Sequence, residues 1–411
     1  MHKKVNISIT RSVILCFLFS FLAACSTNKI NQPTKLERVK DQVSIKRLWK
    51  RSVGTGDDGL ALQLSPVRVQ DELYTIDIEG NLSVLDRILG KKIWSRKLKE
   101  GVSGGLGDDK KHLYYTTFQG ELVCIDRANG DEIWRVPLTS VSIAAPASNG
   151  QLVVAQTIDG KLLAFSAENG ASRWRYDSAV PLLSLRGSPT PLISQKYTIS
   201  NFANGEMVTI DNRNGSQIWK AVLGLPKGRT ELERLVDADG QAVLDGDKLY
   251  AIAYQGKLVA LDVSTGHEIW SKDMSSYNGV ALGFSQIYVT TDSGLVIAFN
   301  QENGKEIWRN EKLKYRRLST PVIFGNTLIT DDFKGYLHFL SPKNGEFVAR
   351  KRPDHHGIMG KSIVYGNDIY LYGRTGSLIA YHLDDSAQTS SENQHHQKTI
   401  NPARSVGSRH K

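Results

Sequence analysis

The chain has 411 residues, enough for two or three ordinary domains or for one large repeat architecture with a substantial core. Its formal net charge is +10, but residues 1–24 and residues 386–411 contribute +3 each, which leaves about +4 for the body. This surplus is too small to argue for a nucleic-acid-binding surface. In a chain of this length, internal repeats are the first feature to look for.

The N-terminus is organised like an export signal. Lys3, Lys4 and Arg11 precede the apolar run SVILCFLFSFLAA, which is shorter than the roughly 20 residues that a membrane-spanning helix needs. The sequence therefore predicts a signal peptide over residues 1–24.

The end of this run, LAAC at residues 22–25, resembles the bacterial lipobox. The resemblance implies that Cys25 becomes the first residue of the mature chain and carries a diacylglycerol on its sulfur. Each buried methylene of an acyl chain contributes about 0.8 kcal/mol to membrane binding. Ser26 replaces the Asp that usually marks inner-membrane retention, which implies the outer membrane. We expect residues 25–44 to be a lipidated flexible tether; the alternative is a cleaved secretory signal with an incidental cysteine.

The remaining cysteines exclude an internal disulfide in the exported part of the chain. Cys16 leaves with the signal peptide and Cys25 takes the lipid, so only Cys124 is left. It lies in the strand-like segment ELVCID, which predicts a small buried hydrophobic side chain.

One sequence unit recurs along the body of the chain at intervals of 38 to 51 residues. Its first marker is a glycine in a tight-turn context, at positions 80, 120, 160, 205, 256, 294, 335 and 376. A second glycine follows ten residues later in the first seven units, and the position four residues beyond it is a tryptophan in six of them. Including one tryptophan before the first unit, all seven tryptophans of the chain belong to this pattern: Trp49, Trp94, Trp134, Trp174, Trp219, Trp270 and Trp308. Ala349 takes the position in the seventh unit.

The segment KLYAIAYQGKLVALDVSTGHEIW, residues 248–270, shows the structure of one unit. Strand-like runs flank the pair Gln255-Gly256, and an X-Gly pair in this position is a hairpin signal because glycine accepts a positive φ. The link DVSTG then ends the second strand with turn residues, and a third strand carries the tryptophan. A proline stands fourteen residues before the first glycine in four units and marks the start of a further, innermost strand. These prolines are Pro66, Pro146, Pro191 and Pro321.

Eight such units predict an all-β fold, an eight-bladed β-propeller with four-stranded antiparallel blades, over residues 45–385. A blade cannot bury both faces alone, so we expect the tryptophans to fill the space between stacked blades. The eighth unit has no tryptophan after it, whereas Trp49 precedes the first unit. The N-terminal strand is therefore expected to close the last blade and remove an exposed edge. Residues 386–411 lack apolar periodicity and are predicted to form a disordered basic tail.

The spacing Asp-x-x-x-Gly-x-x-x-Trp resembles the repeat of the pyrroloquinoline-quinone dehydrogenases. That family binds quinone and calcium on the propeller axis, often with a disulfide between adjacent cysteines, and needs a catalytic aspartate. This chain has no adjacent cysteine pair and lacks the large insertions that usually shape that active site. We therefore expect no enzyme activity, no cofactor and no metal; a quinoprotein dehydrogenase is the alternative.

A lipobox followed by eight such units, over residues 25–383, also resembles the propeller lipoproteins of the outer-membrane β-barrel assembly machinery. The resemblance is specific in LSLRG at 183–187 and DAD at 237–239. It implies a lipid-anchored, non-enzymatic scaffold on the periplasmic face of the outer membrane, which binds the POTRA region of BamA and assists insertion of outer-membrane proteins. The partner-binding residues that it implies are Leu183, Leu185, Arg186, Asp237 and Asp239. Binding of unfolded outer-membrane protein clients at a blade edge is a further hypothesis, and an adaptor for another envelope complex is an alternative.

The loop lengths independently place both segments on one rim. The connection from Trp219 to the next inner strand is the longest of the eight, and the one after Trp174 is among the next longest. Arg186 and Asp237 each stand five residues before the expected start of an inner strand. Equivalent offsets in successive blades predict that the two loops lie side by side.

Leucines, an arginine and carboxylates on one rim are typical of a protein-binding hot spot. The alternative from the residues alone is that the leucines fold inward. Arg186 would then pair with Asp237 or Asp239 and brace the two loops. The sequence leaves both interpretations open.

Four pairs of potential metal or acid–base residues have simpler interpretations. The two histidine pairs lack a nearby cysteine or a spaced set of acidic partners, so we interpret them as exposed loop or tail residues. The two aspartate pairs stand among glycines and are interpreted as turn residues. These pairs are His355-His356, His395-His396, Asp57-Asp58 and Asp108-Asp109.

Overall fold

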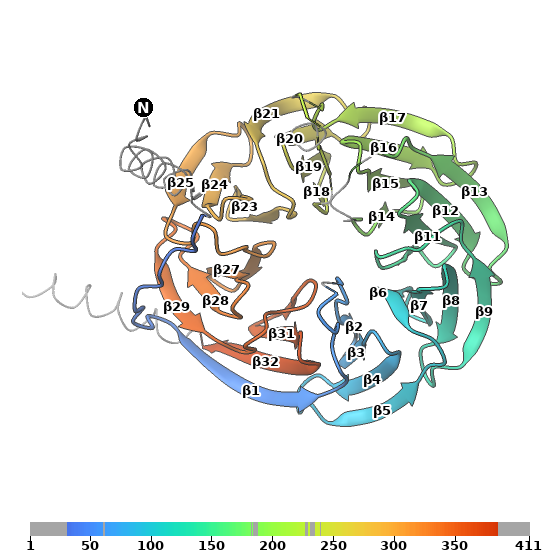
Figure 1. Cartoon of the computed structure of the whole chain (residues 1–411), viewed down its shortest axis with the longest axis horizontal. Coiled ribbons are helices and arrows are strands. Elements are labelled where there is room, and N and C mark those ends of the chain that lie inside the picture. The colour runs from blue at the N-terminus through green and yellow to red at the C-terminus, as the bar shows by residue number, and fades with distance from the viewer. Residues whose placement is uncertain are drawn as a thin grey trace, which may run out of the picture.

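The structure, a computed structural model, describes residues 31–60, 62–181, 183, 188–226, 229–230, 235–238 and 240–384. Their 32 strands form eight four-stranded sheets, arranged as blades around a central axis (Figure 1). Strands adjacent within a blade are antiparallel, which confirms the predicted eight-bladed propeller. In the part of the chain that the structure describes, no helix has the length and apolar character needed to cross a membrane.

Blades 1 to 4 follow one another in chain order, each running from its innermost to its outermost strand. Blade 1 consists of β2 (Val67–Val69), β3 (Glu72–Ile76), β4 (Asn81–Asp86) and β5 (Lys92–Lys97). Blade 2 consists of β6 (Val102–Asp108), β7 (His112–Thr117), β8 (Glu121–Asp126) and β9 (Glu132–Pro137). Blade 3 consists of β10 (Ala147–Ser148), β11 (Leu152–Thr157), β12 (Lys161–Ser166) and β13 (Ser172–Asp177). Blade 4 consists of β14 (Leu192–Ile193), β15 (Tyr197–Asn201), β16 (Glu206–Asp211) and β17 (Gln217–Val222).

Blades 5 to 8 continue the ring, and only the last blade combines the two ends of the chain. Blade 5 consists of β18 (Val243–Asp245), β19 (Lys248–Ile252), β20 (Gly256–Asp262) and β21 (Glu268–Met274). Blade 6 consists of β22 (Ala281–Gly283), β23 (Gln286–Thr290), β24 (Val296–Asn300) and β25 (Glu306–Asn310). Blade 7 consists of β26 (Val322–Phe324), β27 (Thr327–Asp331), β28 (Leu337–Leu340) and β29 (Phe347–Lys351). Blade 8 consists of β30 (Ile363–Tyr365), β31 (Asp368–Gly373), β32 (Ser377–Asp384) and β1 (Ser44–Ser52).

The four repeat prolines stand where the sequence predicts, each directly before an innermost strand. β2, β10, β14 and β26 begin at the residue after Pro66, Pro146, Pro191 and Pro321. Proline fixes φ and has no N–H to donate, so it is tolerated at the first position of a strand and not within its ladder.

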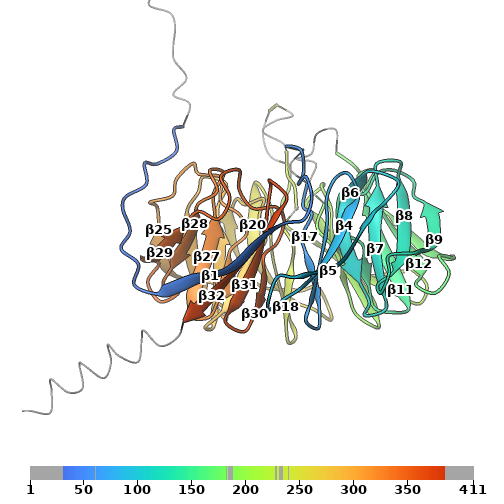
Figure 2. The same cartoon turned by 90° about the horizontal axis from the view of Figure 1, so that it is seen from below.

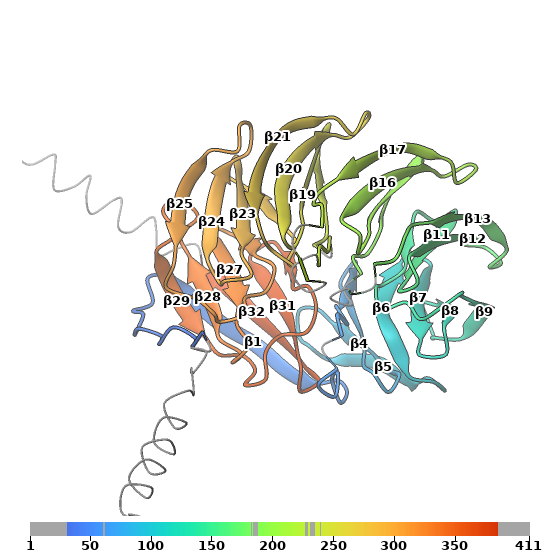
Figure 3. The same ribbon diagram turned by 45° about the horizontal axis from the view of Figure 1, so that its top comes forward.

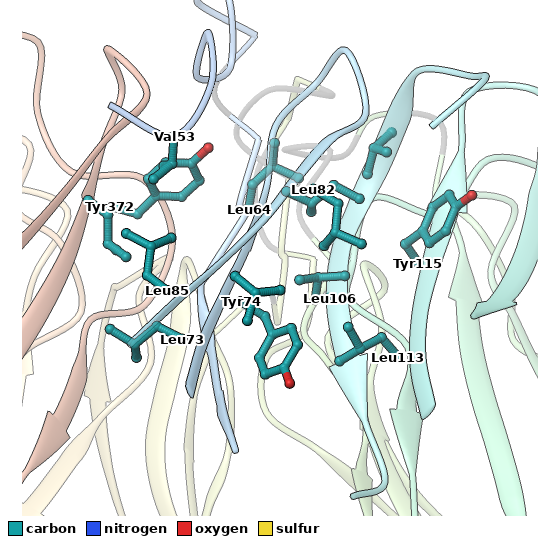
Figure 4. Close-up of a cluster of buried hydrophobic side chains, with 14 of the residues drawn as sticks. Val53, Leu64, Leu73, Tyr74, Leu82, Leu85, Leu106, Leu113, Tyr115 and Tyr372 are labelled. Carbon is teal, nitrogen blue, oxygen red and sulfur yellow. The ribbon is translucent and has the colours of Figure 1, made fainter. Parts of the chain in front are cut away.

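The middle strands of the blades are buried on both faces. Four consecutive residues are buried in β3 and again in β4, so these strands do not alternate between apolar and polar side chains. Figure 4 shows one continuous cluster to which blades 8, 1 and 2 all contribute, for example with Tyr372, Leu85 and Leu113. Because the burial lies between blades, each blade depends on its neighbours for stability.

The tryptophans pack on turn glycines of the following blade. A Cβ built on Gly266, whose φ is +73°, would lie 2.6 Å from Cδ2 of Trp219. The indole Nε1 of Trp219 also donates a hydrogen bond to the Val263 carbonyl at 2.9 Å. The same tryptophan–glycine contact recurs at Trp49–Gly90, Trp94–Gly130, Trp134–Gly170, Trp174–Gly215, Trp270–Gly304 and Trp308–Gly345. Seven blade junctions therefore share the same contact between an indole and a turn glycine.

The residue before the tryptophan is skipped by the strand pairing. In blade 5 the register moves from Ala260–Trp270 to Leu261–Glu268, which leaves Ile269 in a β-bulge with 46% of its surface exposed. Blades 1 to 4, 6 and 7 have a register shift at the corresponding place. Bulges interrupt the free hydrogen-bonding edge of an outer strand and so discourage unspecific pairing.

The N-terminal strand closes the ring, as predicted. β1 pairs with β32 along its length, and Trp49 packs on blade 1. The junction between blades 7 and 8 differs because the outer strand of blade 8 comes from the N-terminus. No turn joins β32 to β1, so blade 8 offers no glycine turn to an indole from blade 7. Ala349 takes the tryptophan position there and is fully buried beside Ile45.

The N-terminal segment of residues 34–42 lies along blade 7. Thr34 N donates to the Lys314 carbonyl at 3.0 Å, and Gln42 N donates to the Val348 carbonyl at 2.7 Å. Asp41 pairs with Lys351 at 2.6 Å. Residues 34–42, which lie within the predicted tether of residues 25–44, are thus bonded to blade 7 in the structure. The sequence of this segment does not indicate the contact with blade 7, because most of these bonds use backbone groups and charged side chains and leave no apolar pattern.

Two arginines, one in blade 7 and one in the loop before it, bind the N-terminal segment of residues 34–42. Arg316 donates to the Thr34 carbonyl at 3.0 Å and, through Nε, to Asp332 at 2.6 Å. Arg350 donates to the Glu37 carbonyl and, through Nε, to Nδ1 of His338 at 3.0 Å. Since Nδ1 accepts this bond, the imidazole proton is on Nε2, which lies 3.1 Å from Asp332. Burial lowers the pKa of His338, which keeps the ring neutral.

Candidate partner-binding face

One face of the ring carries the connections between blades, and we call it the connection face. The turns between the second and third strands lie on this same face: Leu98 N donates to the Gly80 carbonyl, and Leu223 N to the Gly205 carbonyl, both at 2.8 Å. The connections are on the upper side of the ring in Figure 2. Loops on this face can reach a partner without disturbing the strands below.

Two adjacent connections on this face contain the predicted partner-binding segments. Residues 178–191 join blade 3 to blade 4, and residues 223–242 join blade 4 to blade 5; these three blades are neighbours in Figure 3. The blade 4 turn lies between the two loops. Asn204 of this turn donates to Ser178 at 3.1 Å, while its Gly205 accepts from Leu223. The described bases of the two loops, at Ser178 and Leu223, therefore lie beside the same blade 4 turn.

The first loop displays apolar side chains to solvent. Leu183 is 47% exposed, so it does not fold into the core as the alternative interpretation required. Leu185 and Arg186 lie outside the described residues. The sequence reasoning overlooked Val180 and Leu225, which are 50% and 61% exposed on the two loops. Each stands three residues after the end of its outer strand, and this shared offset could have revealed them.

Asp237 is placed differently from the expectation of a partner contact. It has no solvent-exposed surface, and its neighbours Val236 and Ala238 are buried as well. Its backbone forms a bridge with Tyr254 of blade 5, in which Tyr254 N donates to the Asp237 carbonyl at 2.7 Å. This backbone pairing draws residues 235–238 into the propeller. Asp239 lies outside the described residues.

The next residue along this loop is held from blade 4. The buried side-chain amide of Asn201 donates to the Gly240 carbonyl at 2.9 Å. The described residues on either side of position 239 are therefore both held, Asp237 by its bridge to Tyr254 and Gly240 by its bond from Asn201.

Lys220 and Glu206 form an ion pair on the outer part of blade 4. Lys220 pairs with Glu206 at 2.7 Å, and this hydrogen bond raises the pKa of the lysine. Burial, with the nearby Glu206 carboxylate, raises the pKa of Tyr176. At neutral pH the lysine is thus a cation and the tyrosine is neutral.

Two features of quinoprotein sites can be compared with the described residues, a cysteine pair at the cofactor and a group of metal ligands. Cys124 is buried in β8, and burial raises the pKa of its thiol to about 12, so it is an inert side chain and not half of a cofactor-contacting disulfide. Among the residues that the structure describes, no three His, Cys, Asp or Glu side chains gather to hold a metal ion.

The fold and the recurring tryptophan unit define a class, the β-propellers built from quinoprotein-like repeats. Within this class the chain belongs to the family described as outer membrane protein assembly factor BamB, whose model matches residues 78–310 and 286–406. The BamB of Pseudomonas aeruginosa is 45% identical over 88% of this chain and 95% of its own length. The BamB of Kangiella koreensis is 38% identical over 93% and 98%.

One solved structure agrees with this assignment, and another shares the fold. The crystal structure of BamB from Moraxella catarrhalis matches with a TM-score of 0.75 and 25% identity, over 82% of this chain and 100% of that one. A quinohemoprotein alcohol dehydrogenase from Comamonas testosteroni matches with a TM-score of 0.65, at 12% identity over 88% and 82%. At that identity the second likeness concerns the fold alone.

Proposed function

We propose that this chain is a non-enzymatic scaffold of outer-membrane protein assembly that binds the POTRA region of BamA through the two loops of blades 3 to 5. The observation that carries the proposal is the display of Val180, Leu183 and Leu225 on adjacent loops whose bases are fixed to blade 4. Exposed apolar side chains on neighbouring loops are typical of protein-binding hot spots.

The proposal gives the predicted residues different roles. Leu183 contacts the partner directly, together with Leu185, Arg186 and Asp239. Asp237 is a positioning residue, because its bridge to Tyr254 anchors the loop that presents Asp239.

The proposal also places the chain on the periplasmic face of the outer membrane, held by acyl chains on Cys25. The family name supports outer-membrane protein assembly as the process, and the sequence of residues 1–25 supports the anchor. Acylation at a single position would leave the propeller free to turn about the anchor unless further contacts fix it.

Co-purification tests the partner surface. The full-length lipoprotein carrying Leu183→Glu, Arg186→Glu or Asp239→Lys should each retain less BamA, because loss of a hot-spot contact costs about 2 kcal/mol or more, roughly thirtyfold in affinity. Leu89→Glu is the matched control, since Leu89 is 66% exposed in a blade 1 turn on the opposite face. Full retention of BamA by all three folded variants would contradict the proposal.

The quinoprotein alternative is tested by the same preparation. A dehydrogenase would take up pyrroloquinoline quinone in the presence of calcium and show its absorbance. We expect no uptake, because Cys124 is buried and forms no disulfide in the part of the chain that the structure describes. Stoichiometric quinone binding would reinstate the enzyme hypothesis.

A further inference from the structure

A cluster of cations and aromatic rings occupies the connection face above blade 7, far along the ring from the loops of blades 3 to 5. Tyr315 and Phe333 are 37% and 39% exposed. Arg317, Lys334 and Arg352 are exposed around them. We call these five residues the blade 7 patch.

Backbone contacts make the patch one continuous surface. Phe333 N donates to the Arg316 carbonyl at 3.2 Å, which ties the blade 7 turn to the loop that carries Tyr315 and Arg317. Arg352 Nε donates to the Lys334 carbonyl at 3.0 Å. The ammonium of Lys334 lies 5.7 Å from the centre of the Phe333 ring.

The outward charge of the patch is positive because its carboxylates point inward. Asp332 and Asp354, in the same loops, are each 1% exposed. Within the described part of the chain, none of Arg317, Lys334 and Arg352 pairs with a carboxylate. At the edge of the patch, Lys312 and Lys314 are neutralised by Glu37 and Glu311. His355 and His356, which the predicted site did not use, are exposed beside Asp354.

The patch adjoins the place where the N-terminal segment reaches the connection face. Thr34 is bonded to the Lys314 carbonyl, one residue before Tyr315. Figure 2 shows this segment rising along the outside of the ring from β1 to the side that carries the connections. Thr34 is nine residues after Cys25, and nine residues span at most about 30 Å even when fully extended.

From this placement we propose that the blade 7 patch rests on anionic phospholipid headgroups of the membrane that holds the anchor. Exposed cations attract anionic lipids, and aromatic rings beside them favour the interface between headgroups and acyl chains. A protein partner could also meet a basic surface, but the short path to Cys25 places the lipid surface within reach of this sector. The inference rests on the proposed acylation of Cys25.

The consequence is an orientation for the whole propeller. Residues 34–42, fixed to blade 7, form a short strap between lipid and ring. The membrane would then lie against the connection face at blade 7, while the loops of blades 3 to 5 remain at another sector of the same face. The strap and patch together would prevent free rotation about the anchor.

Photo-crosslinking of the full acylated chain in vesicles tests this contact. A benzophenone amino acid is placed at position 333 or, as a matched control, at Phe284, which is 51% exposed in a blade 6 turn on the opposite face. We expect several-fold more lipid labelling from position 333 in vesicles of phosphatidylglycerol and phosphatidylethanolamine. In phosphatidylcholine vesicles the difference should shrink.

Charge reversal separates the patch from general membrane proximity. The pair Arg317→Glu and Lys334→Glu should lower labelling from position 333 several-fold, whereas Lys343→Glu, in a blade 7 turn on the opposite face, should leave it unchanged. Equal labelling from positions 333 and 284, or labelling at 333 that ignores lipid charge, overturns the inference. Flotation of the chain with vesicles is a second measurement, which tests the anchor. A chain that floats but shows no preferential labelling at position 333 contradicts the patch alone. A chain that does not float contradicts the anchor on Cys25 as well.

Discussion

Seven blade junctions and the junction between blades 7 and 8 solve the same packing problem differently. At the seven, an indole packs on a glycine turn of the next blade. At the eighth, Ala349 takes the tryptophan position, and the N-terminal segment covers blade 7. The difference follows from topology, since a strand supplied by the N-terminus brings no preceding turn with it. The tryptophan is thus a feature of a junction between two blades and not of a blade by itself.

The largest expected effect is at a tryptophan junction. Trp219 is 7% exposed, so Trp219→Ala should lower the free energy of unfolding by about 3 to 5 kcal/mol through lost contacts and a cavity. Chemical denaturation of the purified chain measures this change. A value within error of zero would exclude a role for Trp219 in blade stacking.

A glycine pair separates the packing role of the turn from its backbone role. Gly266 and Gly246 both have positive φ, but a Cβ on Gly266 meets Trp219 at 2.6 Å whereas one on Gly246 meets nothing within 4 Å. Both alanine variants should pay about 1 to 2 kcal/mol for the left-handed backbone. Gly266→Ala should cost about 1 to 3 kcal/mol more, from overpacking. Equal losses of unfolding free energy in the two variants, measured by chemical denaturation, would mean that the indole of Trp219 moves aside without cost.

The smallest expected effect tests the blade that lacks a tryptophan junction. Burial lowers the pKa of His338, so the folded state resists protonation that the unfolded chain accepts. Stability is therefore lost as the pH falls below about 6.5, by at most about 2 kcal/mol per proton at pH 5. His338→Gln can keep both hydrogen bonds and should show a shallower fall. Chemical denaturation of the wild-type chain and of the His338→Gln variant at pH 7 and pH 5 measures this fall. An equal loss of unfolding free energy in the two proteins would contradict the prediction.

The repeat markers were predictable because each depends on local chemistry. Pro66 and its three equivalents precede inner strands, and the glycines occupy turns with positive φ. These requirements recur in each blade, so the strands and turns assigned in one unit could be transferred to the others. Leu183 and the loop that carries it were found because the loop departs from the repeat.

The parts that sequence reasoning missed depend on contacts between distant residues. Asp237 was expected at the surface, yet its backbone pairs with Tyr254, and no side-chain pattern announces such a bridge. Val180 and Leu225 share an offset from the ends of their outer strands, but only the paths of the two loops show that both side chains are exposed. Residues 34–42 bind carbonyl groups and arginines about 280 to 310 positions away, which leaves no local periodicity.

The sequence by itself determined the eight blades, their strand order and the closing role of the N-terminal strand, because turn glycines, prolines and buried runs act over a few residues. Only the tertiary structure decided which loop residues face solvent, why Ala349 replaces a tryptophan, and where the N-terminal segment docks. These depend on which surfaces the closed ring brings together, since a blade gains its buried area from a neighbour and the ends of the chain meet only when the ring is complete.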